Sequence, residues 1–525
     1  MNVIFVTQSG FALFYLDLLP SLNRKLSFDR IGFYVTNKSH YSEYSEKAES
    51  LDLNVKFLKA WEMVSVIHKK PDYDVLRTLE REFGEPFLWD ALVMDRVVYN
   101  GTLTTCMQDY KPRFTHDEML TRLQESFKAV LEFIGDIKPD IIVGGFTPVS
   151  LGEYIFYLCA KAKGIKYINL NPTKILNYVT FSEEVCREFP HVEQDYKKYL
   201  EGDNKKDGFL EKADEYIQSN TDKYEGVIIS SPRFAYKRWC MSILKWPYVV
   251  AKYYLRRDYL DNQVKADHLA YFYRNIYNPL KNRIVQRFVP YYTVKELSQL
   301  EYVYYPLHVE PEIALSLFGK EYLNQIELIR NIAKSIPVTW KLVVKDHPAG
   351  VGRRNIRYYK KLLEIPNVVL VNHYIDSKDV IKNAKMIFTV SGFSGFEALL
   401  KRKPVITFGK VFYNILPKYM ANNVRSLQDL PFVVKWLLEN YKYSEKNILY
   451  LIAAVIKNSV SLNLYTQVLK KEKRFAVSSE ALSEQKKEFV DLLVQSISRE
   501  AKIQLFEIKD KDLNLEYLSS VKSVG

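Results

Sequence analysis

TVSGFSGFEAL, residues 389–399, and KPVITFG, residues 403–409, decide the fold of this chain of 525 residues. The pattern is an apolar strand that ends in a Ser/Gly loop, then a helix and a second apolar strand. At such a junction, free backbone N–H groups and the positive end of the helix point at one spot above the carboxyl edge of a parallel sheet. The stretch therefore predicts a Rossmann-like unit with a site for a phosphate.

The side chains of this stretch suit a nucleotide. We expect Ser391, Gly392, Ser394 and Gly395 to surround the phosphate, and Glu397, one turn into the helix, to accept hydrogen bonds from a ribose. The alternative is a helix N-terminus in which the Glu completes a capping box and no ligand is needed. The position after a buried strand favours binding.

Strands and helices alternate around this stretch and predict a second α/β domain over residues 298–425 with a parallel sheet covered on both faces. The expected strands are 302–305, 338–344, 368–371, 386–390 and 405–408. The expected helices are 321–335, 354–363, 377–383 and 395–401.

Two further loops of this domain carry polar groups to the same sheet edge. Lys345 and His347 directly follow a strand, and either can pair with phosphate or polarise a leaving group. The loop Tyr304–Glu312 follows the first strand of the domain and holds His308, Glu310 and Glu312. These side chains offer a base, or hydrogen bonds to sugar hydroxyls or a nucleobase.

The first part of the chain predicts another Rossmann-like domain, residues 1–181, which begins with a strand, the polar turn Gln8-Ser9-Gly10 and an apolar helix. The expected strands are 2–7, 30–35, 53–57, 138–145 and 165–170, and the expected helices include 73–100, 116–136 and 150–164.

Residues 182–297 are polar, helical in pattern and rich in Tyr, Lys and Arg, and they predict a linking region. Within it, residues 236–257 hold six Lys and Arg without one Asp or Glu, interleaved with Trp and Tyr. Such a helix is typical of contact with an anionic membrane surface, although a solvated helix that covers a domain is the alternative. We expect Pro247 to break or kink it. Residues 426–525 predict a helical region that packs back on the first domain.

Composition places the chain among folded proteins, with 47% hydrophobic and 26% charged residues. No apolar run reaches the ~20 residues that span a bilayer, and the first residues lack a signal-peptide pattern, so we expect a cytoplasmic protein, peripheral at most on the cytoplasmic face of the inner membrane. The net charge of +13 indicates an anionic partner, and no motif points to nucleic acid. Four scattered cysteines, Cys106, Cys159, Cys186 and Cys240, indicate neither disulfides nor a metal site.

In several short blocks the sequence resembles the capsule polysaccharide biosynthesis glycosyltransferases, which include transferases of CMP-activated 3-deoxy-octulosonate (Kdo). The blocks are PLHVEPE at 306–312, KDHP at 345–348, and SGFSGFEAL with KPVITFG and Phe412-Tyr413. In the first half, FGEP at 83–86 followed by Asp95-Arg96 resembles another stretch of the same enzymes.

The resemblance implies a GT-B fold, in which two Rossmann-like domains face a cleft, with a nucleotide-sugar donor on the second domain. It implies no metal and no cofactor, and it gives Lys345, His347, Ser391, Ser394 and Glu397 to the nucleotide. The sequence departs from the family at Phe393, where a small polar residue is commoner. The leaving phosphate then depends on a helix dipole and basic side chains.

The first domain must supply a carboxylate as base or nucleophile towards the acceptor hydroxyl. The candidates are Asp95, Glu85 and Glu153, and we rank Asp95 first on the family pattern. The sequence thus predicts a glycosyltransferase acting on a surface polysaccharide or glycolipid. A nucleotide-sugar epimerase of the same fold and a non-catalytic scaffold are the alternatives. Donor, acceptor and stereochemistry stay open.

Overall fold

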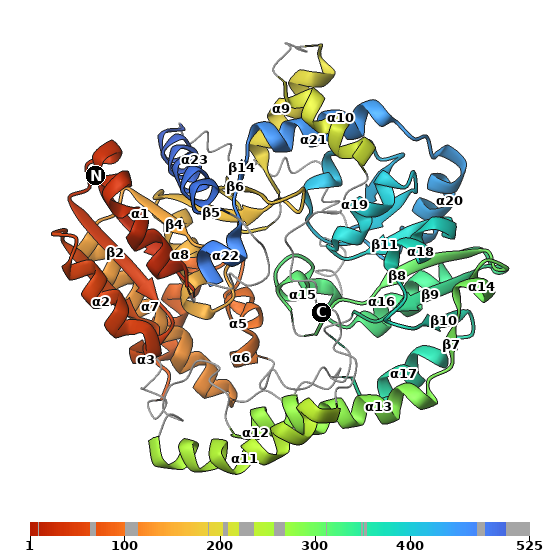
Figure 1. Cartoon of the computed structure of the whole chain (residues 1–525), viewed down its shortest axis with the longest axis horizontal. Helices are drawn as coiled ribbons and strands as arrows, with labels where there is room; N and C mark the ends of the chain where they lie inside the picture. The colour runs from red at the N-terminus through yellow and green to blue at the C-terminus, as the bar shows by residue number, and fades with distance from the viewer. Residues whose placement is uncertain are drawn as a thin grey trace, which may run out of the picture.

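The computed structural model describes the chain except for residues 9, 64–69, 100–113, 187, 203–207, 220–235, 257–267, 311, 348–349, 351–353, 470–477 and 500–525. Its described part is built around two seven-stranded sheets, one in each half of the molecule (Figure 1). Each sheet is mainly parallel and carries helices, which is the α/β, two-domain GT-B architecture expected from the sequence.

The N-terminal sheet has the strand order β14-β6-β5-β4-β1-β2-β3. Strands β3, β2, β1, β4 and β5 are parallel, whereas β6 and β14 join antiparallel at one edge. The strands are β1 (Asn2–Val6), β2 (Arg30–Val35), β3 (Val55–Lys59), β4 (Ile141–Gly144), β5 (Lys166–Pro172), β6 (Tyr178–Ser182) and β14 (Val460–Ser461).

The helices of this half form because apolar side chains recur on one face and polar groups cap the ends. A capping box of Thr115 and Glu118 starts the longest of them, and buried apolar residues along it pack on the sheet. The helices are α1 (Phe11–Leu26), α2 (Tyr41–Glu49), α3 (Ala60–Met63), α4 (Tyr73–Phe83), α5 (Trp89–Met94), α6 (Arg96–Tyr99), α7 (His116–Ile137) and α8 (Leu151–Ala162), with a 3₁₀ turn at Lys38–His40.

The C-terminal sheet has the order β13-β12-β11-β8-β9-β10-β7, and all its described pairs are parallel. Its strands are β7 (Tyr291–Tyr292), β8 (Tyr302–Pro306), β9 (Lys341–Lys345), β10 (Val368–Val371), β11 (Ile387–Thr389), β12 (Val405–Thr407) and β13 (Ala421–Asn423). Its helices are α14 (Val294–Leu297), α15 (Ile313–Ser316), α16 (Gln325–Lys334), α17 (Ile356–Leu363), α18 (Ser377–Asn383) and α19 (Phe393–Leu400), with 3₁₀ turns at Lys320–Tyr322 and Phe412–Ile415.

The linking region and the C-terminal region connect the two halves. From the linking region, α9 (Pro190–Leu200) and α10 (Phe209–Ser219) pack on α21 (Glu445–Lys457) beside the C-terminal domain. After α20 (Leu430–Asn440) and α21, the chain returns to the first half through β14, α22 (Leu464–Leu469) and α23 (Ser479–Ser498), whose apolar face packs against α1. The two regions therefore tie the domains together, and α23 packs where the sequence predicts.

A long helical arm lies along one edge of the molecule below both domains (Figure 1). It consists of α11 (Tyr236–Arg256), α12 (His268–Phe272), a π-helical turn at Tyr273–Tyr277 and α13 (Asn278–Phe288). Val285 near its end and Val289 just after it join the core of the C-terminal domain. No described helix is long and apolar enough to span a membrane.

The structure corrects several boundaries expected from the sequence. The helix expected over 73–100 is broken into α4, α5 and α6, because Gly84-Glu85-Pro86 ends α4 in extended backbone. The break expected at Pro247 does not occur, since α11 runs through it. Trp239 and Trp246, which precede the proline, donate to the Ile276 and His268 carbonyls at 2.9 and 3.4 Å and fasten α11 to the second half of the arm.

Of the cysteines, Cys159, Cys186 and Cys240 are free thiols, and Cys106 lies outside the described residues. Among the described residues, no three His, Cys, Asp or Glu side chains are grouped so that they could hold a metal ion.

Candidate functional site

The phosphate site predicted from the sequence centres on the start of α19. Strand β11 ends at Thr389, and α19 begins at Phe393 after Gly392, whose N–H donates to the Thr389 hydroxyl at 3.0 Å. No side chain caps this helix. Glu397 lies five residues beyond the N-cap, so it cannot form a capping box with it. The first-turn N–H groups therefore keep the arrangement that binds anions.

Two of the predicted residues shape this loop. Ser391 is buried, and its hydroxyl donates to the Ala314 carbonyl at 3.1 Å, which ties the loop to α15. That hydroxyl is therefore already used in this structure, and Ser394 is the serine left to face a ligand. Gly395 is needed for packing, because a Cβ there would overlap the hydroxyl of Tyr413, which donates to the Gly392 carbonyl at 2.7 Å.

His308 lies beside the same helix start. Its Nε2 is 3.4 Å from the Thr389 hydroxyl, and its Cε1 would lie 3.4 Å from a Cβ added at Gly392. The backbone of His308 is fixed by Gln325, which accepts from its N–H at 2.8 Å and donates to its carbonyl at 3.1 Å. The imidazole is buried and points towards the loop that precedes α19. The structure thus brings together residues more than 80 positions apart in sequence.

Behind these loops lies a buried ionic network centred on Arg354, which has no exposed surface. Its guanidinium pairs with Asp346, lies 3.8 Å from Glu310 and donates to the His308 carbonyl at 2.6 Å. Tyr358 donates to Glu310 at 2.9 Å. Burial raises the pKa of Glu310, and the Arg354 guanidinium opposes the rise. Glu310 and Asp346 therefore hold the loops in place from below.

Lys345 and Glu397 form the charged part of the site. Lys345 ends β9 and is 5% exposed, and burial lowers its pKa while Asp346, Asp376 and Glu397 oppose the fall. Burial raises the pKa of Glu397, against the influence of Lys378 and Lys345. The nearby carboxylates do not fully offset the cost of burying the Lys345 ammonium group, and such a group suits a site that binds an anion.

The remaining predicted residues of this domain lie close by. Glu312 is the N-cap residue of α15, the helix to which Ser391 is bonded. His347 follows Lys345 and Asp346 in the loop after β9, and its carbonyl accepts from the Gly350 N–H at 2.8 Å.

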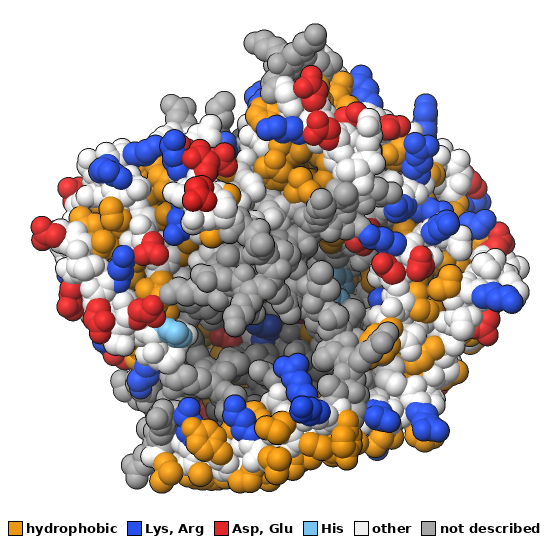
Figure 2. Space-filling view, in the orientation of Figure 1, with side chains coloured by type: hydrophobic (Ala, Val, Ile, Leu, Met, Phe, Trp, Pro, Cys, Tyr) orange, Lys and Arg blue, Asp and Glu red, His pale blue; other side chains and the backbone are white. Residues whose placement is uncertain are grey.

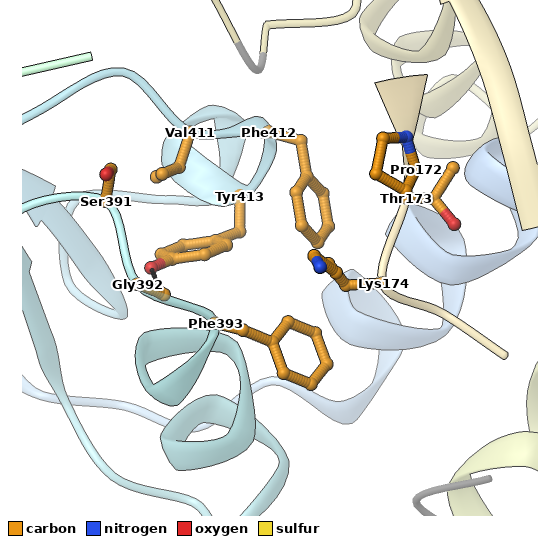
Figure 3. A pocket seen from close by; sticks show the side chains of 9 residues that line it. All are labelled: Pro172, Thr173, Lys174, Ser391, Gly392, Phe393, Val411, Phe412 and Tyr413. Carbon is orange, nitrogen blue, oxygen red and sulfur yellow. Dashed lines mark hydrogen bonds between the residues drawn. The ribbon is translucent and has the colours of Figure 1, made fainter. Parts of the chain in front are cut away.

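A pocket joins this site to the N-terminal domain (Figure 3). The empty space of about 250 Å³ includes open solvent, and the closed part is about the size of one water molecule. One wall is the loop after β5, and the opposite wall is the start of α19 with the turn that follows β12. The lining residues are Pro172, Thr173, Lys174, Ser391, Gly392, Phe393, Val411, Phe412 and Tyr413.

Lys174 is the residue of this pocket that sequence reasoning missed. Its backbone is left-handed, with φ of 67°, and its side chain extends between the rings of Phe393 and Phe412 (Figure 3). A non-glycine residue in that conformation is uncommon, and such strain clusters at functional positions. It brings a cation from the first domain to the helix start of the second.

His373 was missed as well. It follows β10, is 3% exposed, and neither ring nitrogen has a hydrogen-bond partner among the described residues. Burial lowers its pKa to about 4, although nearby Asp346 opposes this, so the ring is neutral at pH 7. Its position among Lys345 and Asp346 was not predictable, because the sequence pattern only showed a strand end.

The three candidate carboxylates of the N-terminal domain differ in what surrounds them. Asp95 is buried and accepts from the Leu151 N–H at 2.8 Å and the Val98 N–H at 3.2 Å, so it holds the start of α8. Glu85 is partly exposed and 2.5 Å from Lys161. The catalytic role expected for either stays a prediction, and the geometry gives Asp95 a capping role.

Glu153 is fully enclosed at the carboxyl edge of the first sheet. Its Oε2 accepts from Gln8 and from the Val149 N–H, both at 2.8 Å, and links the loops after β1 and β4. Burial raises its pKa to about 8, against those two hydrogen bonds. The side chain is therefore mostly protonated at pH 7.

This pKa predicts a pH dependence of stability. A folded-state pKa raised from 4.5 to about 8 gives stability that is present below pH 4.5 and is lost as pH rises to about 8. The loss amounts to roughly 4 kcal/mol. We expect Glu153→Gln to gain stability over the natural chain at pH 8 and to gain little at pH 5, as measured by denaturant unfolding. Glu132→Gln, an exposed control on α7, should lose as much unfolding free energy between pH 5 and pH 8 as the natural chain does. If Glu153→Gln loses the same amount over this range, Glu153 is not the group responsible.

Part of the chain matches a known protein family, in addition to the two-sheet α/β fold described above. Residues 232–417 match the family model of the capsule polysaccharide biosynthesis proteins. This match confirms the resemblance predicted from the sequence blocks, and it extends from the helical arm to the loop after β12.

Two curated relatives match shorter stretches. The capsule polysaccharide export protein KpsS of Escherichia coli is 27% identical over 18% of this chain and 25% of its own length. Protein FixF of Sinorhizobium fredii is 30% identical over 23% of this chain and 30% of its own length. The chain thus spans less than a third of either relative.

Solved structures with a similar arrangement include a β-Kdo 2,7 transferase, KpsC of Thermosulfurimonas dismutans, at 13% identity and a TM-score of 0.33 over 73% of this chain and 97% of that one. A UDP-GlcNAc 2-epimerase from Neisseria meningitidis is 13% identical, with a TM-score of 0.27 over 94% of this chain and 100% of that one.

Proposed function

We propose that the chain is a glycosyltransferase of capsule assembly that transfers a sugar from a nucleotide-sugar donor to a glycan or glycolipid acceptor. The observation that supports it most is the uncapped start of α19, which lines a pocket together with Lys174 and follows a strand of the same sheet in which β9 ends at the buried Lys345. A CMP-activated sugar is the donor suggested by the family resemblance.

The proposed reaction begins when the acceptor hydroxyl attacks the anomeric carbon of the donor. The bond from that carbon to the phosphate oxygen breaks, and its electron pair leaves with the phosphate. The N–H groups of α19, Lys345, His347 and Lys174 stabilise the charge that develops there, without a metal ion. His308, buried beside the helix start, would donate to the leaving oxygen or orient the phosphate.

The proton of the acceptor hydroxyl goes to a carboxylate of the N-terminal domain. Asp95 and Glu85 remain the proposed groups. Both oxygens of Asp95 already accept hydrogen bonds from backbone N–H groups, which makes Asp95 a weaker base. Glu312 and Glu397 would contact the sugar or the ribose. The protein would work in the cytoplasm at the inner face of the membrane, where glycolipid acceptors are built.

The proposal is tested by incubating the purified chain with CMP-, UDP- and GDP-sugars and a glycolipid extract, and by following nucleotide release by chromatography. Release that needs the acceptor and survives EDTA is the expected result. Conversion of donor without acceptor would indicate an epimerase instead. No release and no conversion from any donor would support the scaffold.

His347→Ala gives the matching prediction for the site. We expect it to abolish turnover, because the leaving phosphate loses a basic partner, while the midpoint of thermal unfolding stays unchanged. His116→Ala, a control on the partly exposed surface of the other domain, should keep full activity. Turnover that survives His347→Ala would remove this residue from the site.

A further inference from the structure

The helical arm exposes large apolar side chains along most of its length. On α11 the exposed residues Met241, Leu244, Tyr248 and Leu255 follow one another at spacings of three, four and seven, and they are 59–84% exposed. Residues at these spacings share one face of a helix. A single exposed Leu needs no explanation, but a continuous apolar face marks a contact surface.

The second half of the arm repeats the pattern. From α12 to α13 the exposed residues Tyr273, Tyr277, Leu280, Ile284 and Phe288 recur every three or four positions and are 38–71% exposed. Figure 2 shows hydrophobic side chains along the lower edge that these helices form, with Lys and Arg directly above them.

The two halves form an antiparallel hairpin. Trp239 bonds to the Ile276 carbonyl, Trp246 packs on Phe272 with ring centroids 5.2 Å apart, and Tyr253 lies 4.6 Å from the His268 ring. The three α11 residues are spaced seven apart, so they share the inner face, opposite the exposed apolar one. The apolar face is therefore left over after the hairpin has made its own contacts.

The charge of the hairpin has one sign. Residues 236–256 hold five Lys and Arg, residues 268–288 hold four, and neither segment holds a single Asp or Glu. On α11, Lys245 and Lys252 stand at seven-residue spacing beside the apolar face, where long basic side chains can reach headgroups while the apolar face enters the bilayer. Nine of the 75 Lys and Arg thus stand on this hairpin with no acidic residue among them.

We propose that this hairpin, residues 236–256 with 268–288, lies flat on an anionic phospholipid bilayer. Exposed apolar residues enter the boundary between headgroups and acyl chains, and the basic residues contact the phosphates. An acidic protein partner would not require so wide an apolar face. The inference goes beyond the proposed transferase activity, because it names the surface of the chain that contacts the membrane and the lipid charge that this surface recognises.

The test is co-sedimentation of the full chain with vesicles of phosphatidylcholine alone and of phosphatidylcholine mixed with phosphatidylglycerol in equal amounts. We expect binding to the mixed vesicles that weakens with salt, and little binding to the neutral ones. Each basic residue near the surface contributes a factor of about five. The double variant Lys245→Glu/Lys252→Glu should therefore bind at least about 25-fold more weakly.

Two further variants separate the explanations. Lys435→Glu/Lys442→Glu makes the same change of net charge on exposed residues at and beyond α20, away from the arm, and should bind like the natural chain. Leu244→Gln/Tyr248→Gln should weaken vesicle binding at unchanged charge and unchanged fold.

Equal binding of all variants would overturn the proposal. The proposal would also be overturned if the natural chain does not bind vesicles and is a dimer in gel filtration that becomes a monomer when Leu244 and Tyr248 are changed. Nucleotide binding without vesicles is unaffected in either case, so failure here is distinct from failure of the transferase proposal.

Discussion

Arg354→Ala is expected to lower the free energy of unfolding by about 3–5 kcal/mol, the largest effect on stability of any single change at this site. The guanidinium has no exposed surface and is the buried cation paired with Asp346. Its loss leaves that carboxylate and Glu310 buried without a counter-charge, and it removes the donor to the His308 carbonyl. Denaturant unfolding measures the change.

Matched variants decide whether the buried charge is responsible. Arg357→Ala removes an exposed arginine three residues further on, in α17, and should change stability by no more than about 0.5 kcal/mol. Arg354→Lys keeps the charge but not the planar fork, so an intermediate loss is expected. Equal stability of Arg354→Ala and Arg357→Ala would show that the network does not stabilise the domain.

Lys345→Met is expected to cut the rate of sugar transfer about 10²- to 10³-fold, since it removes a charge that acts on the leaving phosphate. The same change should leave the unfolding midpoint unchanged or raise it, because burying a lysine with a lowered pKa costs stability. Loss of activity without loss of stability distinguishes a binding residue from a structural one.

Lys341→Met is the control for that prediction. Lys341 begins the strand that Lys345 ends, so the same substitution lies at the opposite edge of the same sheet. We expect its rate to equal that of the natural chain. If the two variants lose activity equally, or if Lys345→Met unfolds at lower temperature, Lys345 is a structural residue.

The sequence was sufficient where local chemistry and the pattern of burial agreed. Helix α18 begins and ends where predicted, because Asp376 caps it and Ala384 ends it in extended backbone. The Ser/Gly loop, Lys345 and His308 were expected at one sheet edge, and the structure brings them there, since parallel strands end at a common edge.

The sequence alone was insufficient where segments far apart in the chain decide the contacts of the site or the pairing of strands. The hydroxyl of Ser391 is taken by Ala314, and Lys174 reaches the pocket from a loop more than 200 residues away. Strand β6 escaped notice because it joins antiparallel at an edge of a mainly parallel sheet. The break expected at Pro247 does not occur because α11 also contacts the second half of the arm, 22 and 37 residues further on, and these contacts outweigh the missing backbone bond.

The central claim is that the start of α19 holds the phosphate of a nucleotide. Thermal unfolding of the natural chain with CMP, UDP, GDP and ADP at matched concentrations tests it most directly, because a ligand that binds only the native state stabilises it by RT ln(1 + [L]/Kd). A raised midpoint with one nucleotide, absent in Lys345→Met and kept in Lys341→Met, is the predicted result. A midpoint unchanged by all four nucleotides, or raised equally in both variants, would contradict the claim.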